Sequence, residues 1–221
     1  MKKNTFAIIG LGRFGMSLAQ TLLEEGKDVI VIDNDMEKLK TLKNTPAVLC
    51  CIDNISVETL RESGVADCDV VIIGIGGDLE ANILAAMDSL ELGVKKVLSK
   101  ANNDEHARIL EKIGAEVVFP EVQTAKKLAM KLCNNFVQDI VPFSDDFFIM
   151  QFLVPQELDG KTVLEADLRK KYEVNIVAMI IDGKARAIIK PETVLKSGDS
   201  LLVSGTSRNI KSLRKALNAI N

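Results

Sequence analysis

The sequence predicts an α/β protein in which a Rossmann-type, doubly wound parallel sheet is followed by a small α+β C-terminal domain. Six short apolar runs in the first half are nearly continuous, as expected of parallel strands that helices cover on both faces. Helical segments separate these runs, and several of them stop at a glycine, the usual left-handed C-terminal signal. The chain has 221 residues, of which 47% are hydrophobic and 27% charged. This composition excludes a disordered chain and suits one large domain or two modest ones.

The first half of the chain alternates strands and helices in a regular order. The apolar runs place strands at residues 6–9, 29–32, 47–52, 70–73, 96–98 and 116–119. The helical patterns cover residues 14–24, 36–43, 57–62, 80–92, 105–113 and 121–136. Six strands alternating with helices predict a Rossmann domain over residues 1–137.

The second half has shorter elements. Residues 138–146 are expected to form a turn or connector, and residues 147–221 a separate small α+β domain. We expect strands at 147–154, 175–181, 185–189 and 200–204, and helices at 163–172 and 210–220. Asp182-Gly183-Lys184 predicts a tight hairpin turn, because Asp-Gly supplies the positive φ angles that such a turn needs. A cluster of phenylalanines suits packing between domains and equally a subunit interface: Phe136, Phe143, Phe147, Phe148 and Phe152.

Gly10-Leu-Gly-Arg-Phe-Gly15 is a G-x-G-x-x-G run that follows the first strand and opens the first helix. Its first glycine allows a tight turn, the second lets backbone approach a diphosphate, and the third lets the helix pack on the strand. The diphosphate would lie at the positive end of the helix. Asp33, at the end of the second strand, is placed to accept hydrogen bonds from a ribose hydroxyl, and it disfavours the 2′-phosphate of NADP. The sequence therefore predicts a nucleotide site, in which Arg13 could meet terminal phosphates or a dinucleotide bridge.

Several other functions are disfavoured by what the sequence lacks. Its 28 basic and 31 acidic residues leave a net charge of −3, whereas nonspecific nucleic-acid binders normally carry a basic excess. No apolar run approaches the roughly 18–20 residues that span a bilayer, and the first residues do not resemble a signal peptide, so we expect a soluble, cytoplasmic protein. There is no P-loop motif. Cys50, Cys51, Cys68 and Cys133 show no zinc-site spacing with His106, the one histidine. We interpret the cysteines as small buried hydrophobes and His106, by its position on a helix, as a polar surface residue.

Several segments resemble the RCK family, the regulatory subunits of Trk and Ktr potassium transporters. In the first half these are Gly10–Gly15, Val31–Asp35, Ile73–Asn82, Leu110–Ala115 and Phe119–Glu121. In the second half, Asp167–Ala178 and Leu195–Gly205 are similar to the C-terminal domain of that family. The similarity spans nearly the whole chain, and the combination of two domains distinguishes this family from dehydrogenases.

The resemblance implies a regulatory subunit rather than an enzyme. Homodimers would assemble into an octameric cytoplasmic ring that gates a separate membrane potassium channel or transporter subunit from the inner face of the membrane. The regulatory ligand would be ATP or ADP, with NAD or NADH as the alternative. Matching positions assign nucleotide contacts to Gly10, Gly12, Arg13, Phe14, Gly15, Asp33, Asn34, Asp35, Asp53, Asn54, Ile75, Gly76, Lys100 and His106.

Two further ligands follow from the same resemblance. Glu121 matches a glutamate near the dimer axis that binds a divalent cation, for which a second subunit or phosphate oxygens must supply more ligands. Its other interpretation is a carboxylate that stabilises a helix N-terminus. A cyclic di-AMP site in the second domain would use Leu168, Arg169, Asn175, Ile176 and Pro191. Glu173 departs from the glycine usual in relatives and adds a carboxylate near a dianionic ligand.

Three functions remain open from the sequence. In the first, ATP and ADP favour different angles between paired Rossmann domains, and Arg13 senses the third phosphate. The second is an NAD-dependent oxidoreductase, for which the sequence shows neither a substrate pocket nor a proton donor. The third is a nucleotide-sensing module for a partner unrelated to potassium.

Overall fold

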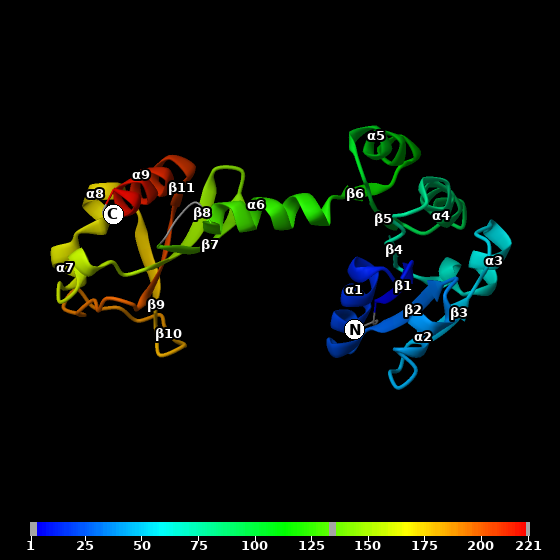
Figure 1. Ribbon diagram of the computed structural model, residues 1–221, viewed down its shortest axis with the longest axis horizontal. Helices are drawn as coiled ribbons and strands as arrows, with labels where there is room; N and C mark the ends of the chain where they lie inside the picture. The colour runs from blue at the N-terminus through cyan, green and yellow to red at the C-terminus, as the bar shows by residue number, and fades with distance from the viewer. Residues whose placement is uncertain (1–3, 133–135, 220–221) are drawn as a thin grey trace. The chain divides into compact units, whose positions relative to one another are not determined.

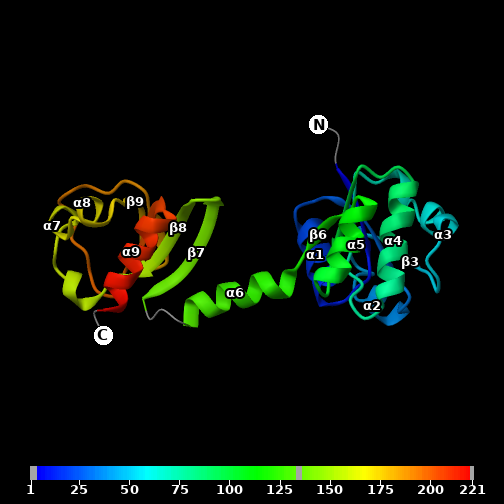
Figure 2. The ribbon, with the colours of Figure 1, turned by 90° about the horizontal axis from the view of Figure 1, so that it is seen from above.

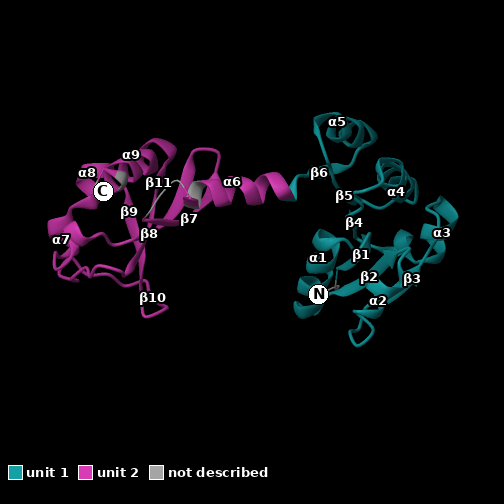
Figure 3. Ribbon diagram, in the orientation of Figure 1, with its two compact units in different colours: residues 1–120 teal, residues 121–221 magenta. Residues whose placement is uncertain are grey.

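The computed structural model describes residues 4–132 and 136–219. The chain divides into two compact units, residues 1–120 and residues 121–221, shown in separate colours in Figure 3. The helix that begins at Pro120 was expected within the first domain, and all but its first residue falls in the second unit.

The first unit is built on a six-stranded parallel sheet (Figure 1). Its strands are β1 (Thr5–Ile9), β2 (Asp28–Asp33), β3 (Val48–Cys51), β4 (Val70–Ile73), β5 (Lys96–Lys100) and β6 (Glu116–Val118). They lie in the order β3-β2-β1-β4-β5-β6, and each neighbouring pair is parallel. The order reverses between β1 and β4, and open α/β sheets bind ligands at such a switch point, beyond the carboxyl ends of the strands. The predicted doubly wound sheet is confirmed.

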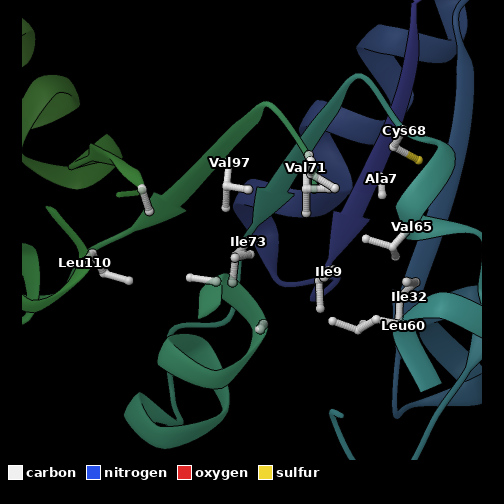
Figure 4. Close-up of a cluster of buried hydrophobic side chains, with 14 of the residues drawn as sticks. Ala7, Ile9, Ile32, Leu60, Val65, Cys68, Val71, Ile73, Val97 and Leu110 are labelled. Carbon is white, nitrogen blue, oxygen red and sulfur yellow. The ribbon is translucent and has the colours of Figure 1, made fainter. Parts of the chain in front are cut away.

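Helices cover both faces of this sheet. They are α1 (Arg13–Glu24), α2 (Met36–Lys40), α3 (Val57–Glu62), a 3₁₀ turn η1 (Val65–Asp67), α4 (Leu79–Glu91) and α5 (Asp104–Ile113). Side chains of β1 alternate between two cores: Ala7 and Ile9 pack with α3, α4 and α5, whereas Ile8 packs with α1 and α2. Figure 4 shows the first core, in which Ile9 of β1 and Ile32 of β2 lie near Leu60 of α3. The continuous apolar runs of the sequence follow from this burial of both strand faces.

The second unit contains an antiparallel sheet with helices. It comprises α6 (Pro120–Leu132), β7 (Val137–Ser144), β8 (Phe147–Leu153), η2 (Gln156–Leu158), α7 (Val163–Ala166), α8 (Leu168–Tyr172), β9 (Asn175–Ile181), β10 (Lys184–Arg186), β11 (Ser200–Thr206) and α9 (Ser207–Asn218). The strand order is β10-β9-β11-β8-β7. Asp182 and Gly183 both have positive φ between β9 and β10, which confirms the hairpin turn.

Several sequence expectations for this unit are wrong. The expected connector over 138–146 is mostly the strand β7, which pairs with β8 and shifts register near Pro142, a residue without an N–H to donate. The expected helix 163–172 is two short helices, because Asp167 between them has a φ of 49°. The expected strand 185–189 stops at Arg186. The expected helix over 121–136 corresponds to α6, which is described as far as Leu132, and Phe136 lies outside a helix. Residues 133–135, including Cys133, lie outside the described residues.

The clustered phenylalanines divide between core and surface. Phe152 is fully buried, and Phe136 and Phe148 pack against the same core. Phe143 is 76% exposed and Phe147 is 36% exposed. Phe136, Phe148 and Phe152 therefore serve packing within the second unit rather than the expected packing between domains. Phe143 and Phe147 leave apolar surface exposed, and the expected subunit interface stays a prediction.

Candidate nucleotide-binding site

A cleft of about 590 Å³ lies at the carboxyl ends of the strands around the switch point. The loops after β1, β2, β3 and β4 form its walls. Those strands place the loops side by side because they are parallel and adjacent in the sheet. The lining residues are Ile9, Gly10, Gly12, Ile32, Asp33, Asn34, Lys38, Ile52, Asp53, Asn54, Ile55, Gly74, Ile75, Gly76, Gly77, Asp78, Glu80, Ala81 and Leu84.

The three glycines of the motif differ in what an added side chain would meet. Gly10 has a φ of 95°, and a Cβ there would lie 2.9 Å from the backbone nitrogen of Ile75. A Cβ on Gly15 would overlap the carbonyl oxygen of Gly10. Gly12 has an ordinary extended backbone, and the nearest atom to an added Cβ is the Gly74 carbonyl oxygen at 3.8 Å. The protein's own packing therefore demands glycine at 10 and 15, but at 12 it leaves open space on the cleft.

The cleft side of Gly12 is also the beginning of α1. Gly12 is the N-cap residue, and no side chain caps the first turn of α1, which contains no acidic residue. The N-terminal N–H groups of a helix favour an anion, through their hydrogen bonds and the helix dipole. Open space beside an uncapped helix start is the arrangement that binds a diphosphate in Rossmann folds.

Asp33 lines the cleft at the carboxyl end of β2 and is almost fully buried. Its Oδ2 accepts a hydrogen bond from the backbone N–H of Leu11 at 2.5 Å. Its Oδ1 accepts from the N–H of Asp35 at 2.9 Å and from Lys38 Nζ at 3.2 Å. Asp33 therefore ties the glycine loop to the turn after β2. A carboxylate offers about four lone-pair sites, so one remains for a ribose hydroxyl.

The loop after β4 forms the opposite wall. The Ile75 carbonyl accepts from Asn82 Nδ2 at 2.8 Å, and the Gly76 carbonyl accepts from Asn102 Nδ2 at 2.7 Å. Lys100, the last residue of β5, brings its Nζ to 3.3 Å from the position of an added Gly76 Cβ. A positive charge thus lies against this loop.

His106 is not the surface residue expected from its position on a helix. It is buried in α5, and its Nε2 lies 3.1 Å from Asn82 Oδ1. The backbone N–H of Asn102 approaches its Nδ1 at 3.4 Å. Burial lowers the pKa of His106 below 6.5, so the ring is neutral at pH 7. The Asn102 contact makes Nδ1 the acceptor and leaves the proton on Nε2.

The cleft brings together eight of the fourteen residues predicted to contact a nucleotide. These are Gly10, Gly12, Asp33, Asn34, Asp53, Asn54, Ile75 and Gly76. The other six do not line it: Arg13, Phe14, Gly15, Asp35, Lys100 and His106. Arg13 is exposed at the first position of α1, so its side chain can still approach a ligand at the helix start.

The sequence analysis missed three charged residues that line the cleft: Lys38, Asp78 and Glu80. Asp78 and Glu80 lie at the start of α4, and Lys38 is the third residue of α2. Asp78 also caps α4, because its Oδ1 accepts from the N–H of Ala81 at 3.0 Å. Lys38 lies five residues after Asp33, on the helix α2 that Asp35 caps, and its Nζ reaches Asp33 Oδ1. With Asp33 and Asp53, these carboxylates line the cleft with acceptors suited to hydroxyl groups.

The cysteines only partly match expectation. Cys68 is buried, and burial followed by the charges of Asp67 and Asp69 raises the pKa of its thiol to about 11. Cys50 is half-buried, but Cys51 is exposed, so its interpretation as a buried hydrophobe is wrong. All three are free thiols.

The residues predicted to bind a cation or a second messenger lie in the second unit. Glu121 is in the first turn of α6. Within residues 4–132 and 136–219, no three His, Cys, Asp or Glu side chains gather as a metal site requires. The predicted cyclic di-AMP residues occupy three segments: Leu168 and Arg169 begin α8, Asn175 and Ile176 begin β9, and Pro191 follows β10. Leu168 is buried in the core of this unit, and Arg169, Asn175 and Pro191 are exposed.

The backbone at Glu173 shows why glycine suits this position. Glu173 ends α8 with a φ of 55° and a ψ of 37°, the left-handed conformation that glycine adopts without strain. A glutamate there carries backbone strain that a glycine would not.

The fold and the cleft together define a Rossmann-type unit with a candidate nucleotide cleft, followed by a smaller α+β unit. Comparison with known proteins then identifies the family. Residues 6–121 match the TrkA-N domain and residues 149–218 match the TrkA-C domain. The chain therefore belongs to the RCK family of Trk- and Ktr-type potassium uptake proteins, as its motifs indicated.

Individual relatives agree over nearly their full length. The chain is 36% identical over 216 residues to the Ktr system potassium uptake protein C of Bacillus subtilis (strain 168), covering 96% of this chain and 97% of that protein. It is 32% identical over 216 residues to the Ktr system potassium uptake protein A of Vibrio alginolyticus, with the same coverage. Among solved structures, a GsuK channel bound to NAD matches with a TM-score of 0.53 and 23% identity. That match covers 100% of this chain and 39% of the channel chain, and it shows the fold alone.

One property bears on the membrane. Within the part of the chain that the structure describes, every helix is too short or too polar to cross a bilayer.

Proposed function

We propose that this chain is the cytoplasmic regulatory subunit of a potassium transport system and that its first unit binds an adenine nucleotide as a signal. The observation that carries the proposal is the open space at Gly12. The protein itself does not need a glycine there, but a diphosphate lying against the uncapped start of α1 does. The chain is related over nearly its full length to Ktr potassium uptake proteins, which supports potassium transport as the process that this signal regulates.

The nucleotide is ATP or ADP, with NAD or NADH as the alternative. The exposed Arg13 at the start of α1 suits terminal phosphates, because a third phosphate adds negative charge within its reach. The carboxylates of Asp33 and Asp53 suit the ribose hydroxyls that all these ligands share. A nucleotide can regulate the membrane partner only if it binds one conformational state of the complex more tightly than the other, and ATP and ADP must differ in that preference.

The nucleotide is bound without being chemically transformed. His106 is the one histidine of the sequence, and both of its ring nitrogens face groups of the protein within a buried site. A dehydrogenase needs a side chain that exchanges a proton with its substrate, and this histidine is not placed to do so.

Assembly and further ligands complete the proposal. The chain forms homodimers within an octameric ring that contacts a membrane potassium channel or transporter subunit. Exposed apolar residues on α6 support burial against another subunit: Val122, Leu128 and Leu132 are 47%, 54% and 75% exposed. From the family resemblance we also propose that the second unit binds cyclic di-AMP and that Glu121 binds a divalent cation.

A ligand panel tests the proposal. A ligand at 100 times its Kd adds about 2.7 kcal/mol of stability, which a thermal-shift assay detects. We expect ATP, ADP or NADH to raise the melting temperature of the purified chain and to be recovered intact afterwards. Turnover of a hydroxy-acid or aldehyde with NADH would instead show an oxidoreductase. A chain that ignores every adenine nucleotide would refute the proposal.

A further inference from the structure

The loop from Ile75 to Gly77 forms one wall of the cleft, and both of its first two carbonyl groups are held from the β5 side. Asn82 of α4 donates to the Ile75 carbonyl at 2.8 Å, and Asn102, just after β5, donates to the Gly76 carbonyl at 2.7 Å. The other side of the loop faces the glycine motif, since an added Cβ on Gly10 would lie 2.9 Å from the Ile75 nitrogen. The loop is therefore fixed by two side-chain amides that lie behind it.

These two hydrogen bonds determine where the loop's N–H groups point. In a trans peptide the C=O and N–H groups point in opposite directions. The Ile75 carbonyl shares a peptide with the Gly76 N–H, and the Gly76 carbonyl shares one with the Gly77 N–H. Because both carbonyls point toward β5, both N–H groups point toward the side of Gly10 and Gly12.

Asn82 can hold this arrangement because its amide is completely satisfied. The residue is fully buried, and besides Ile75 its Nδ2 donates to the Lys100 carbonyl at 3.3 Å. Its Oδ1 accepts from Ser99 Oγ at 2.8 Å and faces His106 Nε2 at 3.1 Å. An asparagine amide has two donors and two acceptor sites, and all four are used. Flipping the amide would set its oxygen against the Ile75 and Lys100 carbonyls and its N–H groups against the Nε2–H of His106, so these carbonyls and His106 fix its orientation.

We propose that Asn82 is a positioning residue of the nucleotide site, which holds the Ile75–Gly77 loop so that the Gly76 and Gly77 N–H groups donate to the bound nucleotide. The role of His106 in this site is then to orient Asn82 from within the protein. The inference rests on the proposed nucleotide binding, because the two donors need an acceptor in the cleft. This positioning role accounts for the buried polar cluster of Asn82, Ser99 and His106, which lies where apolar side chains would otherwise pack.

The experiment compares Asn82→Ala with Ser89→Ala. Ser89 lies on the same helix and is also fully buried, but it donates only to the Ala85 carbonyl of that helix. We expect Asn82→Ala to weaken the affinity for ATP, ADP or NADH at least tenfold by calorimetry and Ser89→Ala to leave it within twofold. In ¹⁵N-glycine-labelled protein without nucleotide, the Gly76 and Gly77 amide resonances should move in Asn82→Ala and stay in place in Ser89→Ala.

Each result decides the proposal. A folded Asn82→Ala protein with unchanged affinity and unmoved Gly76 and Gly77 resonances would overturn it. If Asn82→Ala fails to fold, Ser99→Ala, which removes one hydrogen bond to Oδ1, should give a smaller change in the same two readouts. If the wild-type chain binds no adenine nucleotide, the proposed function fails, while the glycine resonances still report whether Asn82 positions the loop.

Discussion

Replacing Gly12 with alanine should weaken nucleotide binding at least tenfold and leave the fold intact. The added methyl group would lie 3.8 Å from its nearest neighbour, the Gly74 carbonyl oxygen, which is ordinary van der Waals contact. Alanine restricts the unfolded chain and stabilises by about 0.4–1 kcal/mol where the backbone permits it. Alanine is also a poorer N-cap than glycine by roughly 0.7 kcal/mol. The two effects nearly cancel, so the melting temperature should change by no more than a few degrees.

The methyl group does occupy the space through which a diphosphate would approach. We expect a loss of at least tenfold in affinity, or about 1.4 kcal/mol, measured by calorimetry with ATP, ADP and NADH. Gly15→Ala is the contrasting variant, because its Cβ would overlap the Gly10 carbonyl oxygen and overpacking costs about 1–3 kcal/mol. It should lose stability as well as binding. Wild-type affinity in a well-folded Gly12→Ala protein would refute the assignment of the diphosphate to this loop.

Three further predictions concern single side chains. Arg13→Ala should compress the difference between ATP and ADP affinities measured by calorimetry, and unchanged discrimination would remove Arg13 as the phosphate sensor. Burial lowers the pKa of His106 below 6.5, so only the unfolded chain takes up this proton as the pH falls below about 6.5. Stability should therefore fall with pH in that range, and melting curves of His106→Gln should lack this component; an identical slope would contradict it. Glu173→Gly should raise the stability of the second unit by about 1 kcal/mol, because it relieves a left-handed backbone; urea unfolding measures this, and a loss of stability would count against it.

The sequence predicted the first unit well because its signals are local and agree with one another. Strands buried on both faces leave continuous apolar runs, and the glycine motif marks the turn at Gly10 whose φ is 95°. The cleft itself depends on the strand order, which brings the loop after β4 beside that motif and the loop after β3 beside the loop after β2. Lys38 was missed because a lysine on a short helix has no pattern of its own, and only the fold places it beside Asp33.

His106 shows the limit of reading a helix face from sequence. Polar residues on helices are usually exposed, and no residue near His106 in the sequence indicates which side chain it contacts. Its contact with Asn82 joins residues 24 positions apart and requires α4 and α5 to pack side by side, as Figure 2 shows. The misjudged strand β7 has a related cause: Pro142 and the polar residues around it favour a turn, and pairing with β8 prevails.

The most direct test of the account is potassium flux through a membrane Ktr-type subunit reconstituted with this chain, measured with ATP and then with ADP. The account predicts that flux differs between the two nucleotides with wild-type protein and that Gly12→Ala removes the difference. Equal flux with both nucleotides and with none, in a complex that transports potassium and contains the wild-type chain, would contradict it.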